Sequence, residues 1–357
     1  MVAKSQKSHV NSREGTPSGF SCIAEIGVHQ GSISGIAVSP DGNRVMVTNY
    51  GKDSISFIEY RANGPVVRTV VGTDEPFAVA AAGRRAYVST VSPAYDAIMV
   101  LDIDTNHVVD VHPMAESVRD LAVTPEGNQV VAARTTADGA DVAVLDTTNG
   151  RIDAIAIADT PGATAECVRL SPNGRRAYLA TNTASGGNLA VIDTDYRRVV
   201  GTVEIESPIR DVAISPDGGA AYVVSSGPDF GAVLDIIDTR SNAVVSTHKI
   251  AEINGLVTQL ALSRDGERAY LVSDSGVNVL RTQTQELIGT IAVDGQPSCV
   301  TEGPDGTHLY IADYNGTVSM VETASADTAP IFWGDDEPTA AHEWFMPELP
   351  QLEPARS

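Results

Sequence analysis

The sequence predicts an all-β protein, a seven-bladed β-propeller of four-stranded antiparallel blades, and three observations support this prediction. A four-residue turn motif recurs along most of the 357 residues, with its glycines 41, 44, 47, 44, 48 and 40 residues apart. The fourth residue after this glycine is tyrosine in five of the seven copies. Each unit between two turns contains short apolar runs rich in Val, Ile and Tyr. A repeat of this length indicates an architecture in which each unit stacks on the next.

The turn motif reads Ser-Pro-Asp-Gly in its clearest form. Serine at the first position, proline at the second and glycine at the fourth suit a type I turn. The seven copies occupy residues 39–42, 80–83, 124–127, 171–174, 215–218, 263–266 and 303–306. The residues four positions after the glycines are Met46, Tyr87, Val131, Tyr178, Tyr222, Tyr270 and Tyr310. Because the register is constant, we expect the same local structure in every unit.

Each unit divides into four strands. An apolar run precedes the turn, as in residues 212–214, and a second run follows it, as in residues 177–180. A third run such as 189–193 and a fourth such as 199–203 complete the unit. Evenly spaced runs of this composition predict antiparallel strands. Since both faces of each sheet are apolar, the sheets must cover one another around an axis, as in a propeller.

The N-terminal strand is predicted to close the ring. The seventh repeat supplies three strands and ends near residues 317–323, whereas residues 22–28 resemble the missing fourth strand. Pairing the two ends removes an open sheet edge. The domain prediction is therefore a polar, disordered tail over 1–21, a propeller over 22–323 and an acidic tail over 324–357.

The units resemble the YVTN-type propeller repeat, in which Tyr-Val-Thr-Asn is followed by Val-Ser-Val-Ile-Asp-Thr. Thr48 and Asn49 with residues 55–58, and Thr181 and Asn182 with residues 190–194, carry the resemblance, which spans about residues 22–323. Relatives of this type include surface-layer-like proteins and sugar lactonases. The resemblance thus implies the propeller fold, and it adds two functional alternatives, a lactonase-like hydrolase and a cell-envelope surface protein.

Composition limits the classes of partner. The formal net charge is −22, which argues against nucleic-acid binding, because that affinity rests on Lys and Arg neutralising phosphates. No window approaches the roughly 18 apolar residues of a membrane-spanning helix, and no apolar signal segment precedes Cys22. We therefore expect a cytoplasmic monomer, with envelope association as the alternative. Arginine outnumbers lysine 20 to 4, which is typical of a high-GC bacterium of actinobacterial type.

The channel mouth is the candidate ligand site. In a propeller the first strand of each blade lies nearest the axis, and the residues that begin these strands alternate in charge over blades 2 to 5. In order they are Glu75, Arg119, Glu166 and Arg210. Arg169 stands further along its strand, at a position that is alanine in five of the seven blades. These side chains either form an ion-pair belt between blades or hold a small anionic ligand in the guanidinium forks.

No catalytic residue, metal ligand or cofactor is predicted. The resemblance matches Arg119 and Arg210 to a lactonase arginine, but Asp120 and Asp211 replace the histidine that often follows it. The histidines do not converge as a metal site requires. We therefore favour a non-enzymatic binding or scaffold propeller over the lactonase-like hydrolase.

A protein partner is the other candidate ligand. Loops on the face of the channel mouth form an acidic rim that suits a basic peptide. The C-terminal tail has five prolines and seven acids, and it carries apolar clusters around Trp333, Trp344 and Phe345. These three residues either clamp the outside of the ring or dock on a partner.

Overall fold

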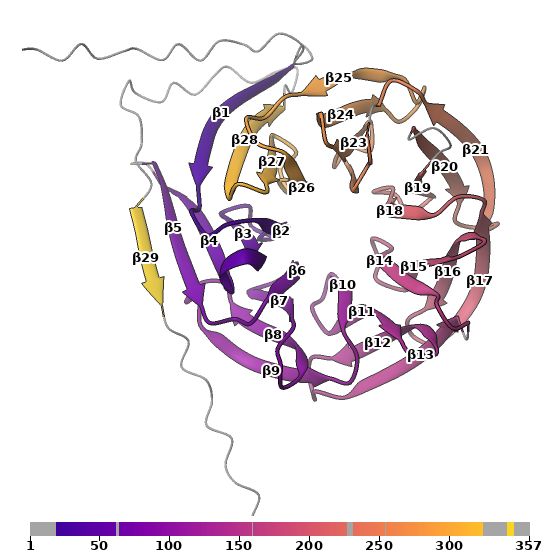
Figure 1. The fold of residues 1–357 in the computed structure, drawn as a ribbon, viewed down its shortest axis with the longest axis horizontal. Helices are drawn as coiled ribbons and strands as arrows, with labels where there is room; N and C mark the ends of the chain where they lie inside the picture. The colour runs from indigo at the N-terminus through magenta and orange to yellow at the C-terminus, as the bar shows by residue number, and fades with distance from the viewer. Residues whose placement is uncertain are drawn as a thin grey trace, which may run out of the picture.

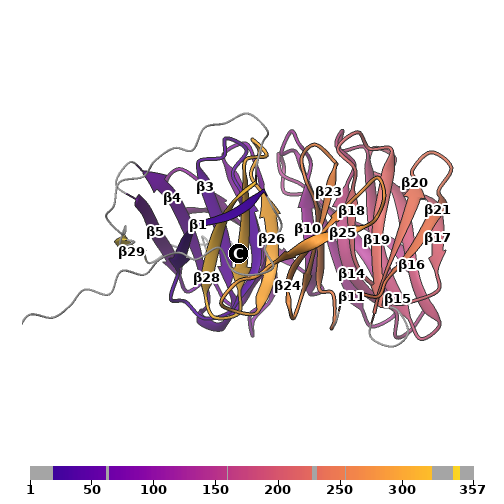
Figure 2. The ribbon, with the colours of Figure 1, turned by 90° about the horizontal axis from the view of Figure 1, so that it is seen from above.

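Seven antiparallel sheets stand in a ring around a central axis. The computed structural model describes residues 19–61, 64–158, 160–226, 231–253, 255–323 and 341–345. The ring is seen down its axis in Figure 1 and from the side in Figure 2. Over the described residues there is no α-helix, and the one 3-10 turn is η1 (Tyr50–Lys52). The predicted seven-bladed propeller is confirmed.

Each blade runs from an inner strand at the axis to an outer strand at the perimeter. Blade 1 contains β2 (Ile33–Val38), β3 (Arg44–Asn49), β4 (Ser54–Arg61) and β5 (Gly64–Val71). Blade 2 contains β6 (Pro76–Ala82), β7 (Arg85–Thr90), β8 (Asp96–Asp102) and β9 (Val108–Met114). Blade 3 contains β10 (Val118–Val123), β11 (Gln129–Thr136), β12 (Gly139–Asp146) and β13 (Ile152–Ala158).

The remaining blades follow the same order. Blade 4 contains β14 (Thr164–Leu170), β15 (Arg176–Thr183), β16 (Gly186–Asp193) and β17 (Arg198–Ile205). Blade 5 contains β18 (Ile209–Ile214), β19 (Ala220–Ser226), β20 (Ala232–Asp238) and β21 (Ala243–Ile250). Blade 6 contains β22 (Gln259–Leu262), β23 (Arg268–Ser273), β24 (Gly276–Arg281) and β25 (Leu287–Ile291). Blade 7 contains β26 (Pro297–Glu302), β27 (His308–Asp313), β28 (Thr317–Thr323) and β1 (Phe20–Gly27).

The N-terminal strand closes the last blade, as the sequence predicts. β1 pairs antiparallel with β28, with Ile26 opposite Val318 and Gly27 opposite Thr317. The backbone N–H of Val28 adds a 2.8 Å hydrogen bond to the carbonyl oxygen of Gly316. The first and last strands of the ring therefore lie in one sheet, and β28 has a partner along its outer edge.

A fifth strand lies outside blade 1. β29 (Ala341–Phe345) pairs in parallel with β5, with Ala341 opposite Val66 and Phe345 opposite Val70. Trp344 lies in this strand, so its backbone pairs with the outer strand of blade 1. Trp333 lies outside the described residues. The docking role of Trp333, Trp344 and Phe345 stays a prediction.

The repeated turns are held by their own side chains. In the first copy the Ser39 hydroxyl donates to Asp41 Oδ1 at 2.5 Å, and the N–H of Gly42 donates to the Ser39 carbonyl oxygen at 2.8 Å. Gly42 has a φ of 76°, which a residue with a Cβ atom adopts at a steric cost. The same serine-to-acid hydrogen bond recurs at Ser215 and Asp217, 2.6 Å apart. The acids of these turns thus have the structural role expected from turn chemistry.

The core consists of seven apolar clusters of buried residues, each formed mainly between two neighbouring blades. Between blades 4 and 5, for example, Tyr178 packs with Val212 and Val223. Tyr178 is 2% exposed and Tyr270 is fully buried, so the registered tyrosines of the repeat pack between the blades. Both faces of each sheet are covered in this way, which explains why the strands are apolar throughout.

Candidate channel site

A β-bulge interrupts the inner strand of most blades near the channel mouth. The register shifts between Val118 and Asp120 in blade 3, and the corresponding shifts in blades 4 and 5 fall at Glu166 and Arg210. In blades 3, 4 and 5 the extra residue of the bulge is therefore Arg119, Glu166 and Arg210, respectively. A bulge re-aims the side chains around it, so the residue that follows takes the position facing the neighbouring blades.

Two aspartates behind these bulges connect the blades. Asp120 Oδ2 accepts a 2.9 Å hydrogen bond from the backbone N–H of Val168 in blade 4, and its Oδ1 accepts one from Leu121. Asp211 Oδ2 likewise accepts a 2.9 Å hydrogen bond from the N–H of Leu260 in blade 6. These aspartates occupy the positions where the resemblance leads one to look for histidine. In this protein they satisfy backbone donors of inner strands in neighbouring blades.

Arg169 lies between the same two aspartates. Its Nη1 is 2.5 Å from Asp120 Oδ2, and its Nη2 is 2.6 Å from Asp211 Oδ1. Its Nη1 also donates to the carbonyl oxygen of Val168 at 2.8 Å. Arg169 therefore joins neighbouring blades through ion pairs, and its carboxylate partners are Asp120 and Asp211, not Glu75 or Glu166.

This cluster is charged and largely shielded from solvent: Asp211 is buried, and Arg169 and Asp120 are partly buried. Burial lowers the pKa of Arg169, but the two neighbouring carboxylates outweigh it and raise the pKa above its ordinary value. Burial raises the pKa of Asp211, and the charge of Arg169 opposes that shift. Arg169 consequently remains a cation at every accessible pH, with two carboxylates beside one guanidinium.

The other four predicted residues do not come together with Arg169. Arg119 is exposed at the mouth, with its Cζ 5.3 Å from the centre of the Phe77 ring. Arg210 Nε donates to the Ser226 hydroxyl at 2.7 Å. Glu166 accepts a 2.7 Å hydrogen bond from the Thr164 hydroxyl.

Glu75 is exposed in the loop before β6, where its φ is 33°. Among the residues that the structure describes, Glu75 and Glu166 form no ion pair with Arg119, Arg169 or Arg210. The alternation of charge in the sequence therefore does not produce a continuous ring of ion pairs at the mouth.

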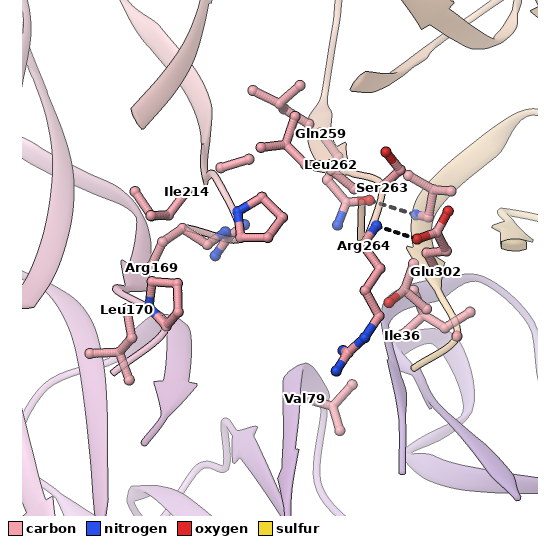
Figure 3. Close-up of a pocket in the computed structure, with 18 of the residues that line it drawn as sticks. Ile36, Val79, Arg169, Leu170, Ile214, Gln259, Leu262, Ser263, Arg264 and Glu302 are labelled. Atoms are coloured by element: carbon pink, nitrogen blue, oxygen red, sulfur yellow. Dashed lines mark hydrogen bonds between the residues drawn. The ribbon is translucent and has the colours of Figure 1, made fainter. Parts of the chain in front are cut away.

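A cavity of about 790 Å³ occupies the channel on the side of the repeated turns. Its walls include the aliphatic side chains Leu170, Ile214 and Leu262. Its polar lining consists of Arg169, Gln259, Ser263, Arg264, Thr301 and Glu302. Figure 3 shows Arg169 and Arg264 extending toward the opening from different sides. The cavity thus reaches Arg169 from the face opposite to the predicted mouth.

Glu302 is the acid of this cavity. Its Oε1 accepts a 3.0 Å hydrogen bond from the Tyr270 hydroxyl, and its Oε2 accepts one from the backbone N–H of Arg264. Burial raises the pKa of Glu302, and these two hydrogen bonds oppose the shift. Gln259 beside it accepts a 2.6 Å hydrogen bond from the N–H of Val300 and so connects blade 6 to blade 7 as the aspartates connect other blades.

Sequence reasoning did not single out Arg264 and Glu302, although the repeat register contains a signal for both. Arg264 stands at the second position of its turn, where five of the seven copies have proline. Glu302 stands four residues before its glycine, where the other six copies are aliphatic: Val38, Val79, Val123, Leu170, Ile214 and Leu262. Charged residues at positions that are otherwise apolar identify the cavity side of the channel.

Neither a metal cluster nor a membrane-spanning helix occurs in the part of the chain that the structure describes. Within it, no three His, Cys, Asp or Glu side chains are grouped as a metal site requires. Within the same part, no helix is long and apolar enough to cross a membrane.

The fold and the channel define a seven-bladed β-propeller with a cavity of ligand size on its axis. No family model matches the chain. The chain is 46% identical over 367 aligned residues to the seven-bladed beta-propeller protein Rv1057 of Mycobacterium tuberculosis, covering 94% of this chain and 93% of that protein. The chain therefore belongs to the family of that propeller protein.

A solved structure shows the same architecture. Hydrazine synthase of Kuenenia stuttgartiensis superposes with a TM-score of 0.73 and 20% sequence identity, covering 84% of this chain and 97% of that chain. At this identity the likeness concerns the fold alone.

Proposed function

We propose that this protein is a non-enzymatic binding propeller whose channel cavity takes a small ligand with an anionic group. The observation that supports this most directly is the Arg264 guanidinium, which extends into the cavity (Figure 3) and has no carboxylate partner among the described residues. An arginine fork binds carboxylate or phosphate through two parallel hydrogen bonds.

The cavity has the properties of a small-molecule site. Its volume of about 790 Å³ falls within the range of roughly 300–1,000 Å³ usual for such sites. Aliphatic side chains form part of the wall, and polar groups, which supply the larger share of its accessible surface, converge from blades 4, 6 and 7. In a small-molecule site the apolar surface provides affinity and the placed polar groups provide orientation.

The state of the channel carboxylates supports binding over hydrolysis. Asp120 and Asp211 each accept hydrogen bonds from two backbone N–H groups and contact Arg169. A carboxylate with these partners is poorly suited to take a proton from water. Arg210, which the resemblance assigns to a lactonase site, is not part of the cavity lining.

The mouth on the opposite face is the surface that we propose for a protein partner. Tyr50 is 47% exposed, and its ring meets that of Phe77 edge to face with 6.3 Å between centres. Arg119 lies over the same Phe77 ring. Tyrosine and arginine are enriched among the residues that dominate binding energy in protein interfaces. We further propose that the chain is of the YVTN type.

Calorimetric titration of the full chain with pentanoate, succinate and inorganic phosphate tests the channel site. We expect at least one of these anions to bind, and Arg264→Ala to weaken that binding by about tenfold or more, as for loss of a hydrogen bond to a charged group. The Arg264→Ala substitution keeps the backbone N–H at position 264, which donates the hydrogen bond to Glu302. Arg119→Ala, at the mouth, is the matched control and should bind the anion like the unmodified protein. Equal binding by the Arg264→Ala variant would contradict the proposal.

A further inference from the structure

The charged groups of the channel do not balance. Arg169 and Arg264 contribute two guanidinium groups, whereas Asp120, Asp211 and Glu302 contribute three carboxylates. Arg268 and Asp265 also act on Glu302, but their charges are opposite and leave this difference unchanged. Arg169 is already in contact with two of these carboxylates, so its charge is more than neutralised. A purely anionic ligand would add to the excess negative charge.

Glu302 is the carboxylate without a direct ion pair: the charge of Arg268 acts on it from beyond ion-pair distance, and the charge of Asp265 opposes that effect. Glu302 forms no ion pair with any residue that the structure describes, and each of its oxygens accepts one hydrogen bond from a neutral donor, Tyr270 or the Arg264 backbone. A carboxylate oxygen has two lone-pair sites, so each retains capacity to accept another donor. Its neighbour Gln259 also lines the cavity. A partly buried carboxylate of this kind is stabilised by a cation that brings N–H donors.

The cationic and anionic subsites lie apart. The backbone of Arg264 contacts Glu302, while the Arg264 side chain extends away from it toward the middle of the opening (Figure 3). The two subsites thus lie at opposite ends of the Arg264 residue, one at its backbone N–H and one at its guanidinium. An α-amino acid carries its ammonium and carboxylate on one carbon and does not span that separation. A chain with the two charges at its opposite ends does.

We propose that the channel ligand is an extended zwitterion of the ω-amino acid class, with its ammonium group on Glu302 and its anionic group on Arg264. This inference rests on the proposed function, because it assigns a ligand class to the same cavity. The apolar walls formed by Leu262 and Ile214 suit the methylene chain between the two charges.

The test compares four probes, three of them with the same five-carbon chain, by calorimetric titration of the full chain. They are 5-aminopentanoate, which has both charges, pentanoate, which lacks the ammonium, pentylamine, which lacks the carboxylate, and glycine, which has both charges on one carbon. We expect 5-aminopentanoate to bind about tenfold or more tighter than each of the others, since each lacks a charge-assisted contact.

Two variants assign the contacts. Glu302→Gln should remove the preference for 5-aminopentanoate over pentanoate while leaving pentanoate binding intact, and Arg264→Ala should weaken both. Glu126→Gln, at an exposed turn outside the cavity lining, is the control for loss of one negative charge. Circular dichroism melting of each variant reports whether the ring is folded.

The outcomes separate the two proposals. If the wild-type protein binds pentanoate as tightly as 5-aminopentanoate, the proposal that the ligand is a zwitterion is overturned. If that pentanoate binding requires Arg264, the proposed function, an anion-binding channel, is still supported. A preference for 5-aminopentanoate that persists in a folded Glu302→Gln variant also overturns the assignment of the ammonium subsite.

Discussion

Asp211 and Arg169 lie on the inner strands of neighbouring blades, and 2.6 Å separates Asp211 Oδ1 from Arg169 Nη2. Asp120 approaches the other end of the same guanidinium from blade 3, so one arginine of blade 4 joins three consecutive blades. Asp211 in turn accepts the N–H of Leu260 and extends the connection to blade 6. This half of the ring is therefore linked near the axis by polar contacts as well as by the apolar clusters between sheets.

Replacing Arg169 with methionine should destabilise the protein strongly. The substitution leaves Asp120 and Asp211 without a cation, and breaking a buried ion pair from one side costs roughly 3–5 kcal/mol. We expect the lower part of this range, because the Arg169 side chain is 28% exposed and the Asp120 side chain 19%. Urea unfolding followed by circular dichroism measures the loss.

Two further variants isolate the cause of that loss. Arg119→Met removes an exposed arginine over Phe77 and should change the free energy of unfolding little. Adding Asp211→Asn to Arg169→Met should recover part of the lost stability, because one unpaired charge is removed. An Arg169→Met protein that unfolds at the same urea concentration as wild type would show that the cluster contributes nothing.

The fold could be predicted from the sequence because its determinants are local and repeated. The turn geometry around Gly42 depends on four consecutive residues, and the register of Tyr178 and its equivalents depends on a fixed distance from such a turn. The closing strand could be predicted because seven inner strands leave one outer strand unaccounted for, and residues 22–28 supply its pattern. Each inference required only spacing and hydrophobicity.

The site could be predicted less well, for two physical reasons. The bulges at Arg119 and Arg210 shift the alternation by one residue, so the following aspartates face Arg169 and the arginines do not. The cavity further depends on Glu302 of blade 7 reaching the backbone of Arg264 in blade 6. A contact between blades is not encoded in local spacing.

Glu302 should make stability depend on pH in a defined direction. Burial raises the pKa of its folded form above the ordinary 4.5, so folding favours the protonated acid. The stability that this group contributes is complete below pH 4.5 and is lost as the pH rises through the folded pKa. The Glu302→Gln variant has an uncharged amide at this position at all pH values, so it should not show this loss of stability as the pH rises. Urea midpoints at half-unit steps from pH 4 to pH 8 measure it, and a constant difference between the two proteins would refute the assignment.

The closing strand should be required for a cooperative ring. Deleting residues 1–30 removes β1 and exposes the edge of β28, a template for pairing with another chain. It also removes Ile26 and Val28 from the cluster between blades 7 and 1. We expect aggregation, or loss of the single sharp melting transition, by light scattering and circular dichroism. A deletion of residues 1–18 leaves β1 in place and is the control. A shortened chain without β1 that melts like the control would place the closure elsewhere.

The purified protein should not hydrolyse phosphogluconolactone above the spontaneous rate. Asp120 and Asp211 stand where the resemblance to lactonases leads one to look for histidine, and both engage Arg169 and backbone N–H groups of neighbouring blades. Arg210, the arginine that the resemblance would assign to a lactonase, donates to Ser226 at the mouth. A pH-indicator assay follows acid release against a protein-free blank. Turnover that is abolished in a folded Arg210→Ala variant and kept in Arg264→Ala would replace the binding function with a lactonase at the mouth.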